Sequence, residues 1–369
     1  SFMLTELPEY PWDAMAPYVA KAKAHPGGAI DLSIGSPVDP TPAVIRDALA
    51  KATDSHAYPT TMGTPALREA IVEWFARRRG VTGLGVENVL PTIGSKEFVA
   101  WLPFMLRLGP GDVVVHPTAA YPTYDIGARM AEATPFPSDD PAEWPENTKL
   151  VWLNSPGNPD GRVLDKAQLK ARVERARELG AYIVGDECYA ELGWSGRWEN
   201  EPIPSLLDPE VTGGDLTGIL TAYSLSKQSN LAGYRAAFVA GDARLIAQLT
   251  NIRKHAGMMQ PGPVQAAMVA ALADDAHVAA QKELYRARRD LLIPALNSAG
   301  YRLDHSEAGL YLWVTEGVDA WASIDKLAGL GIIAGPGVFY GDFYPNHVRL
   351  SLTETDERIA EAARRLLSV

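Results

Sequence analysis

Polar side chains follow four predicted strands of this 369-residue chain at the point where each strand ends. They are an amide, an acid, a lysine and a serine: Asn158 after residues 150–154, Asp186 at the end of residues 182–186, Lys227 after residues 219–224, and Ser95 after residues 87–92. Open α/β sheets build their sites at the carboxyl ends of parallel strands. We therefore expect these four side chains to lie close together.

This set of side chains suits the cofactor pyridoxal phosphate. Lys227 can form the covalent link to its aldehyde, and Asp186 can hold its pyridine nitrogen protonated. The phosphate is an anion that suits the start of the helix opened by Ser95, together with the guanidinium of Arg235. The amide of Asn158 can donate to the ring hydroxyl. The inventory of side chains therefore favours a pyridoxal-phosphate site.

The elements that would position these residues alternate between β-type and helical runs. Strands are predicted at residues 113–116, 150–154, 182–186, 219–224 and 236–240, and helices at residues 96–108, 121–131, 166–178 and 244–254. This alternation predicts an α/β fold with a doubly wound, mostly parallel sheet covered by helices on both faces. Several of the strands are apolar throughout, as strands buried on both faces should be.

Roughly the last hundred residues show a different pattern, which predicts a smaller α+β domain. Its predicted elements are a long helical run at residues 264–298, short β-type pieces at 309–315, 331–334 and 347–352, and an amphipathic helix at 356–367.

Several short motifs occur in a fixed order along nearly the whole chain. In the segment 224–235, Ser224-Leu225-Ser226-Lys227 is followed by Gly233-Tyr234-Arg235, so the arginine comes eight residues after the lysine. The other motifs are LSIG at 32–35, YPTTMG at 58–63, LREAI at 67–71, Pro336-Gly337, and RLS at 349–351. Together they resemble the motifs of the fold-type I pyridoxal-phosphate enzymes of the class I/II aminotransferase family.

The resemblance implies the architecture and the activity. The fold would be the pyridoxal-phosphate transferase fold type I, with a large cofactor-binding domain at residues 39–259. The small domain would combine residues 1–38 with residues 260–369. The protein would be a transaminase whose partners are small molecules, namely amino acid and 2-oxo acid substrates, and it would form a homodimer.

The resemblance also implies roles for individual residues. Lys227 resembles the lysine that binds the cofactor and moves the substrate proton, and Asp186 and Tyr189 complete the catalytic set. The implied cofactor contacts are Asn158 and Tyr189 at the ring hydroxyl, Tyr121 on the ring, and Gly94, Ser95, Lys96 (through its N–H), Ser224, Arg235 and the neighbouring subunit's Tyr58 at the phosphate. Arg349 resembles the arginine that grips the substrate α-carboxylate, a bidentate task that suits guanidinium, with Gly35 and Asn158 beside it.

A purely structural interpretation stays open for these residues taken one at a time. Asp186 and Ser95 could cap helices, Tyr121 could be a core aromatic, and Arg349 could form a structural ion pair. The motif at residues 154–159 is slightly unusual but keeps its Asn-Pro pair. Two further positions carry separate expectations. Tyr340 stands where the family often has Phe and is expected to alter the substrate entrance, and Cys188 is interpreted as an inert buried thiol.

Composition and missing motifs exclude several other classes of protein. The net charge of −11 disfavours nucleic acid as a partner. The chain has no P-loop, no GxSxG elbow and no metal-binding motif, and we expect no metal site. The single cysteine indicates weakly a reducing compartment. No signal peptide or membrane span is evident, so we expect a cytoplasmic protein that does not bind membranes.

The substrate is harder to predict than the reaction. Over the whole chain, the sequence resembles most the actinobacterial succinyldiaminopimelate aminotransferases of lysine biosynthesis, which use glutamate as amino donor. Alternatives with the same fold are a broad aromatic, alanine or aspartate aminotransferase and a carbon–sulfur β-lyase. A non-enzymatic pyridoxal-phosphate sensor would need an additional DNA-binding domain and a basic patch, and the sequence offers neither.

Overall fold

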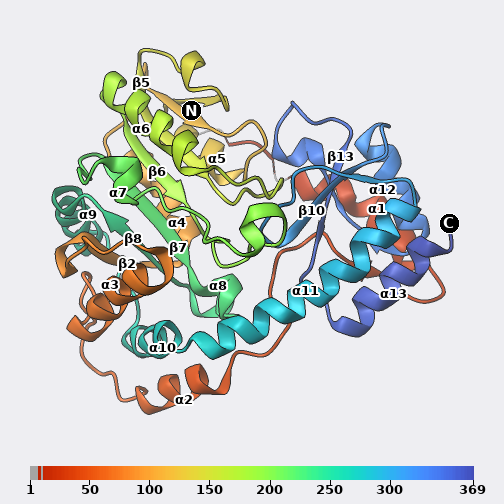
Figure 1. The fold of residues 1–369 in the computed structure, drawn as a ribbon, viewed down its shortest axis with the longest axis horizontal. Helices are drawn as coiled ribbons and strands as arrows, with labels where there is room; N and C mark the ends of the chain where they lie inside the picture. Colours follow the sequence, from red (N-terminus) through yellow and green to blue (C-terminus); the bar gives the residue numbers. More distant parts are fainter. Residues whose placement is uncertain (1–6, 10) are drawn as a thin grey trace, which may run out of the picture.

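Figure 1 shows two lobes, a larger one built on a twisted sheet and a smaller one that holds the carboxyl terminus. The computed structural model describes residues 7–9 and 11–369. The expectation of no signal peptide rests on residues 3–12, of which residues 3–6 and 10 lie outside the described residues. Within the described residues, no helix is long and apolar enough to cross a membrane.

The larger lobe contains a seven-stranded sheet with the strand order β2–β8–β7–β6–β5–β3–β4. Its strands are β2 Val89–Ile93, β3 Val113–His116, β4 Thr134–Pro137, β5 Thr148–Asn154, β6 Tyr182–Asp186, β7 Ile219–Ser224 and β8 Ala236–Gly241. Only β8 runs against its neighbours β2 and β7. The prediction of a doubly wound, mostly parallel sheet is therefore confirmed.

Helices cover both faces of this sheet because its strands present apolar side chains in both directions. The helices of this lobe are α2 Ala43–Lys51, α3 Pro65–Arg79, α4 Gly94–Met105, α5 Thr123–Met130, α6 Lys166–Leu179, α7 Pro209–Thr212, α8 Leu225–Gln228, α9 Ala243–His255 and α10 Gly262–Ala273. One face packs against α2, α3, α6 and α10. The other face packs against α4, α5 and α9.

The smaller lobe contains a four-stranded antiparallel sheet and a two-stranded parallel sheet that brings the amino-terminal segment to it. Its elements are α1 Ala16–Lys23, β1 Ile30–Asp31, α11 Asp275–Ser298, β9 Arg302–Leu303, β10 Tyr311–Thr315, α12 Ala320–Gly329, β11 Ile332–Ile333, β12 Gly335–Pro336, β13 His347–Ser351 and α13 Asp356–Leu367. Six short 3-10 helices complete the described part of the chain: Pro11–Met15, Val86–Asn88, Pro141–Glu143, Gly196–Glu199, Ala232–Tyr234 and Gly337–Tyr340.

The predicted helical run at residues 264–298 is two helices. The chain leaves helical geometry at Asp274, whose side chain accepts a hydrogen bond from the N–H of His277 (3.0 Å) and caps α11. α10 packs in the same apolar cluster as α3 and the large sheet, whereas α11 runs across to the smaller lobe (Figure 1). The division into residues 39–259 and residues 1–38 with 260–369 stays a prediction.

Candidate active site

The carboxyl ends of β5, β6 and β7 meet at one edge of the large sheet. Asn154 lies opposite Asp186 in the pairing of β5 with β6, and Asp186 lies opposite Ala222 of β7. A cavity of about 240 Å³ opens there. It is lined by Ser95, Lys96, Tyr121, Asn154, Asn158, Asp186, Cys188, Tyr189, Ser224, Ser226, Lys227, Ala232, Arg235 and Tyr311. Nine of the residues predicted to bind the cofactor or to act in catalysis therefore line one cavity, although their roles stay predictions.

Asp186 offers a buried carboxylate oxygen that has no partner among the described residues. Its Oδ2 accepts a hydrogen bond from the Tyr124 hydroxyl at 2.7 Å, but its Oδ1 is buried without a hydrogen-bond partner. Asp186 is only 6% exposed, and burial raises its pKa above the ordinary value, although hydrogen bonding by Cys188 and Tyr124 acts in the opposite direction. A buried charged oxygen without a partner is costly. Such an oxygen would accept a hydrogen bond from a protonated ring nitrogen.

Lys227 reaches the cavity from α8, a helix of four residues that follows directly on β7. The Ser224 side chain caps this helix by accepting a hydrogen bond from the N–H of Ser226 at 3.1 Å. The Lys227 Nζ donates to the carbonyl oxygen of Gly35, which belongs to the segment after β1. The helix and the amino-terminal segment together therefore hold the amine at the side of the cavity.

The residues predicted for the phosphate gather where α4 begins. Gly94 has a φ of 71°, and its N–H donates to the Arg235 carbonyl at 2.9 Å. A Cβ at Gly94 would lie 2.3 Å from Nη2 of Arg235 and would push this guanidinium aside, so glycine lets the guanidinium keep its place. The helix start at Ser95 and Lys96, the Arg235 cation and the Ser224 hydroxyl form a cradle that suits a phosphate dianion.

Arg349 comes from β13 of the smaller lobe and lies beside the cavity. Its Nη1 donates to Oδ1 of Asn158 at 2.8 Å, and its Nη2 donates to the carbonyl oxygen of Ser33 at 2.7 Å. Its Nε is buried without a hydrogen-bond partner in the described part of the chain. Tyr311 and Tyr340 lie on the guanidinium, with ring centroids 3.9 and 4.8 Å from Cζ. Tyr340, expected at the substrate entrance, is buried against Arg349.

Two further residues of the cavity have strongly shifted acidities. Burial raises the pKa of Tyr121 to about 12. The Tyr121 ring packs edge-on against Tyr124, with centroids 5.7 Å apart. Burial, with the charge of Asp186 nearby, raises the pKa of the Cys188 thiol well above its usual range. Cys188 therefore stays a protonated thiol at neutral pH.

Tyr58 does not join this cavity within one chain. Its side chain is 95% exposed, in the segment between α2 and α3. Large apolar side chains are exposed nearby in the sequence, namely Ile34, Val38, Val44 and Met62. The prediction that Tyr58 serves the neighbouring subunit therefore stays a prediction.

Sequence reasoning did not single out five residues at or near the cavity. They are Asn154, Ser226, Ala232 and Tyr311, which line it, and Tyr124, which bonds Asp186. Asn154 donates to the Asp186 carbonyl oxygen at 3.1 Å and accepts from the Asn158 N–H at 2.8 Å. Asn154 is the last residue of β5, and this position at a strand end could have identified it as a site residue.

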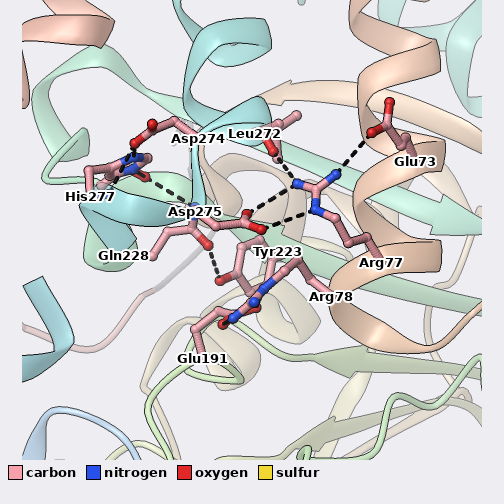
Figure 2. A network of polar contacts seen from close by, with 11 residues as sticks. Glu73, Arg77, Arg78, Glu191, Tyr223, Gln228, Leu272, Asp274, Asp275 and His277 are labelled. Carbon is pink, nitrogen blue, oxygen red and sulfur yellow. Dashed lines mark hydrogen bonds and ion pairs between the residues drawn. The ribbon is translucent and has the colours of Figure 1, made fainter. Parts of the chain in front are cut away.

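A series of hydrogen bonds behind the cavity supports the helix that carries Lys227 (Figure 2). The His277 ring lies 2.7 Å from Asp274 Oδ2 and 2.6 Å from Ser229 Oγ. Gln228 continues the series, because it donates to Ser229 at 3.1 Å and accepts from the Tyr223 hydroxyl at 2.6 Å. The serine of this Ser–His–Asp series is 0% exposed. It therefore cannot meet a substrate, and the series anchors α8 to α11 and β7.

An ion-pair group beside this series ties α3 to the start of α11. Figure 2 shows Arg77 between Glu73, Asp275 and the Leu272 carbonyl oxygen. The neighbouring Arg78 pairs with Glu191 at 2.6 Å. Within the described residues, no group of three or more His, Cys, Asp or Glu side chains could hold a metal ion.

The arrangement of a lysine, a buried acid and an anion cradle at the edge of this sheet is that of fold-type I pyridoxal-phosphate enzymes. Residues 28–366 match the family described as aminotransferase class I and II. The chain belongs to this family, it is a transaminase, and its cofactor is pyridoxal phosphate. The unpartnered Asp186 oxygen and the cradle at Gly94 fit this cofactor.

Curated relatives cover almost the whole chain. A 4-dedimethylamino-4-oxo-anhydrotetracycline transaminase of Streptomyces rimosus is 54% identical over 98% of this chain and 100% of its own length. A probable aminotransferase of Mycobacterium tuberculosis is 53% identical over 98% of this chain and 85% of its own length. An LL-diaminopimelate aminotransferase of Desulforudis audaxviator is 35% identical over 98% of this chain and 96% of its own length.

Solved structures share the fold. An aminotransferase from Neisseria meningitidis superposes with a TM-score of 0.89 at 30% identity, over 98% of both chains. A probable N-succinyldiaminopimelate aminotransferase from Thermus thermophilus superposes with a TM-score of 0.85 at 29% identity, over 97% of this chain and 99% of that one.

Proposed function

We propose that the cavity at the end of β5, β6 and β7 is the transamination site, with Lys227 and Asp186 at its centre. The observation that carries this proposal is the buried, unpartnered Oδ1 of Asp186 in the same cavity as the Lys227 amine. When bound, pyridoxal phosphate supplies a ring that accepts the negative charge developing on the substrate α-carbon. The Asp186 carboxylate holds a proton at the ring nitrogen and so keeps that charge stabilised.

The other residues bind, orient and move a proton. Lys227 takes the proton from the substrate α-carbon, because it lines the cavity and an amine can act as a base there. Arg349 receives the α-carboxylate with its unpartnered Nε side, while Asn158 and Ser33 keep the guanidinium in place. Tyr189 and Asn158 orient the cofactor ring at its hydroxyl. With the cofactor bound, side chains fixed in this way would orient the substrate for the proton transfer, and such orientation would account for much of the expected acceleration.

We further propose that the reaction is that of an N-succinyl-LL-diaminopimelate:2-oxoglutarate aminotransferase, in which glutamate donates the amino group that forms N-succinyl-LL-diaminopimelate in the biosynthetic direction of lysine formation. The whole-chain resemblance to succinyldiaminopimelate aminotransferases supports this choice. The Thermus thermophilus structure carries that name, and the Desulforudis audaxviator relative acts on LL-diaminopimelate by name. Both are more distant than the two relatives above 50% identity.

The Streptomyces rimosus relative favours a second candidate, transamination of an oxo group on a large ring system. Its name states a 4-oxo-anhydrotetracycline, and its identity to this chain is 54%. A broad aromatic, alanine or aspartate aminotransferase and a β-lyase remain alternatives with the same residues. The substrates of these candidate activities differ in the chemical groups at the end far from the reacting carbon. Activity with a panel of oxo acceptors therefore distinguishes the candidates.

The substrate proposal predicts a large selectivity. N-succinyl-LL-diaminopimelate carries carboxylates at both ends, and a buried charge without a partner is costly, so we expect a donor group for the far carboxylate. We expect kcat/KM for the oxo acid from which it forms to exceed that for pyruvate or aromatic 2-oxo acids by at least about a hundredfold, about 2.7 kcal/mol. The measurement fixes glutamate as donor and varies the oxo acceptor, including a tetracyclic ketone. An aromatic oxo acid used as well or better would overturn the substrate but not the reaction.

We also propose a homodimer in which Tyr58 completes the neighbouring site. The exposure of Tyr58 and of Ile34, Val38 and Met62 supports this arrangement. We expect Lys227→Ala and Tyr58→Ala to be each defective, and mixed dimers to regain activity. A mixed dimer has one site without lesions, so random re-association restores about a quarter of the wild-type sites.

The measurement is activity after the two variants are co-refolded, with sedimentation to establish the dimer. If Tyr58 served the site of its own chain, mixing would restore nothing, because every site would keep one lesion. An active monomer at low concentration would also contradict the proposal.

A further inference from the structure

Tyr311 is a buried tyrosine of the smaller lobe that faces the cavity of the larger one. It begins β10, is 4% exposed, and lines the cavity that also holds Lys227 and Asp186. The pairing of β10 with β13 sets it opposite Ser351, two residues beyond Arg349.

The Tyr311 hydroxyl has a fixed position next to the Tyr189 hydroxyl. The two oxygens are 3.1 Å apart, and the rings meet edge-on at a centroid distance of 5.7 Å. On its other side the hydroxyl lies against Gly35, where a Cβ would be only 2.1 Å away. Any larger residue at Gly35 would displace this hydroxyl, so the glycine leaves space for it.

The face of the Tyr311 ring supports the Arg349 guanidinium. The ring centroid lies 3.9 Å from Cζ of Arg349, closer than that of Tyr340 on the same cation. Together with the hydrogen bonds to Asn158 and Ser33, this contact fixes the plane of the guanidinium. A cation in contact with an aromatic face and removed from water is held strongly.

We propose that Tyr311 is a positioning residue with two separable tasks: its hydroxyl is hydrogen-bonded to the Tyr189 hydroxyl and holds it for the cofactor ring oxygen, and its ring holds Arg349 for the substrate carboxylate. The inference rests on the proposed roles of Tyr189 and Arg349. It adds a residue that acts through both of them and connects the cofactor end of the site with the substrate end.

The acidities of the two tyrosines reflect the contact between their hydroxyls. Burial would raise the pKa of Tyr311, but the Arg349 and Lys227 cations and the hydrogen bond with Tyr189 outweigh it and bring the pKa below its ordinary value. Burial, together with the neighbouring Tyr311, raises the pKa of Tyr189 well above its ordinary value. Tyr189 therefore keeps its proton, and a hydroxyl whose position Tyr311 fixes makes a stronger hydrogen bond into the cavity.

Two variants separate the two tasks. Tyr311→Phe keeps the ring under Arg349 and removes only the hydroxyl. Tyr311→Leu removes both the hydroxyl and the aromatic face. Tyr301→Phe is the matched control, because it removes the hydroxyl of another buried tyrosine of the smaller lobe.

The first readout is the absorbance of the bound cofactor as a function of pH. In Tyr311→Phe and Tyr311→Leu we expect the midpoint of the absorbance change to move upward by about half a pH unit or more. The reason is that the ring oxygen, with a weaker donor, holds its proton more tightly. Tyr301→Phe should leave the midpoint where it is in the wild type.

The second readout is the dissociation constant of glutarate, an unreactive dicarboxylate, measured by calorimetry on the holoenzyme. We expect Tyr311→Leu to weaken glutarate binding at least about tenfold and Tyr311→Phe to stay within about threefold of the wild type. An unchanged midpoint in Tyr311→Phe would overturn the first task, and equal affinities in wild type and Tyr311→Leu would overturn the second.

Failure of the proposed site is distinguishable from failure of this inference. If Arg349→Lys left glutarate binding unchanged, the role of Arg349 would be wrong, whatever the Tyr311 variants did. If both Tyr311 variants lost the bound cofactor altogether, Tyr311 would be a packing residue of the scaffold, and the proposal of two separable tasks would be wrong.

Discussion

Replacing Lys227 by alanine is expected to abolish turnover while the protein still binds pyridoxal phosphate without a covalent link. The amine supplies both the link and the proton transfer at the substrate α-carbon, so the loss should be at least about a thousandfold. The phosphate cradle at Gly94, Ser95 and Arg235 does not depend on the lysine. The measurement is a single-turnover rate together with the absorbance of the dialysed protein.

Lys254→Ala is the matched control, because Lys254 is an exposed lysine in the last turn of α9, outside the residues that line the cavity. Its rate and spectrum should equal those of the wild type. Turnover at the wild-type rate in Lys227→Ala would show that another amine carries the reaction. Complete loss of noncovalent cofactor would instead contradict the cradle assigned to the start of α4.

The central strands of the large sheet could be predicted closely from the sequence because burial leaves a simple pattern. β3, β6 and β7 begin and end at the predicted residues, since each is a short apolar run. β4 was not predicted. Its sequence TPFP lacks two backbone donors, and such a strand is tolerated only at an edge, which is where it pairs with β3.

The break between α10 and α11 could not be predicted from periodicity. Residues on both sides of Asp274 favour helix, so the local pattern runs on without interruption. The helices separate because α10 packs against the large sheet and α11 runs to the smaller lobe, which is a tertiary constraint. Pro294, by contrast, lies inside α11 without ending it.

The site residues that lie at the ends of strands of the large sheet could be predicted from the sequence. The residue that the smaller lobe contributes to the cavity could not. Asp186, Asn158 and Lys227 follow strands of one sheet, so their meeting follows from topology alone. Tyr311 lies in the apolar run YLWVT, which has the pattern of a core strand. Only the packing of the two lobes brings Tyr311 to Tyr189. The predicted role of Tyr58 depends on contacts with a second chain.

Replacing Asp186 by asparagine should separate catalysis from stability. Tyr124 donates to one carboxyl oxygen, so the single oxygen of an amide would serve Tyr124 and its NH₂ would face the cofactor. An amide donor requires an unprotonated ring nitrogen, and an uncharged ring accepts electrons poorly. We expect the rate to fall at least about a hundredfold, or about 2.7 kcal/mol. A loss of less than about tenfold would show that Asp186 is not the partner of the ring.

The same substitution should stabilise the cofactor-free protein at neutral pH. Burial raises the pKa of Asp186 in the folded state, so the folded chain holds this proton more tightly than the unfolded chain does. Below the pKa of the unfolded state, about 3.9, the carboxyl is protonated in both states, and its favourable contribution to the free energy of unfolding is complete. This contribution is lost as the pH rises through the higher pKa of the folded state. At pH 7 the buried charge therefore opposes folding, and the amide removes it.

The test of this second effect is the Tm of the cofactor-free proteins between pH 4 and pH 8. Asp186→Asn should melt above the wild type at neutral pH, and the difference should shrink toward acid. The control is Asp215→Asn, because hydrogen bonds from Thr217 lower the pKa of this exposed carboxyl and give no reason for a gain. With cofactor bound, the order should reverse, since the wild-type carboxylate then has its cationic partner and binding stabilises the folded state. A variant less stable than the wild type without cofactor would mean that the Asp186 charge already has a partner in the empty site.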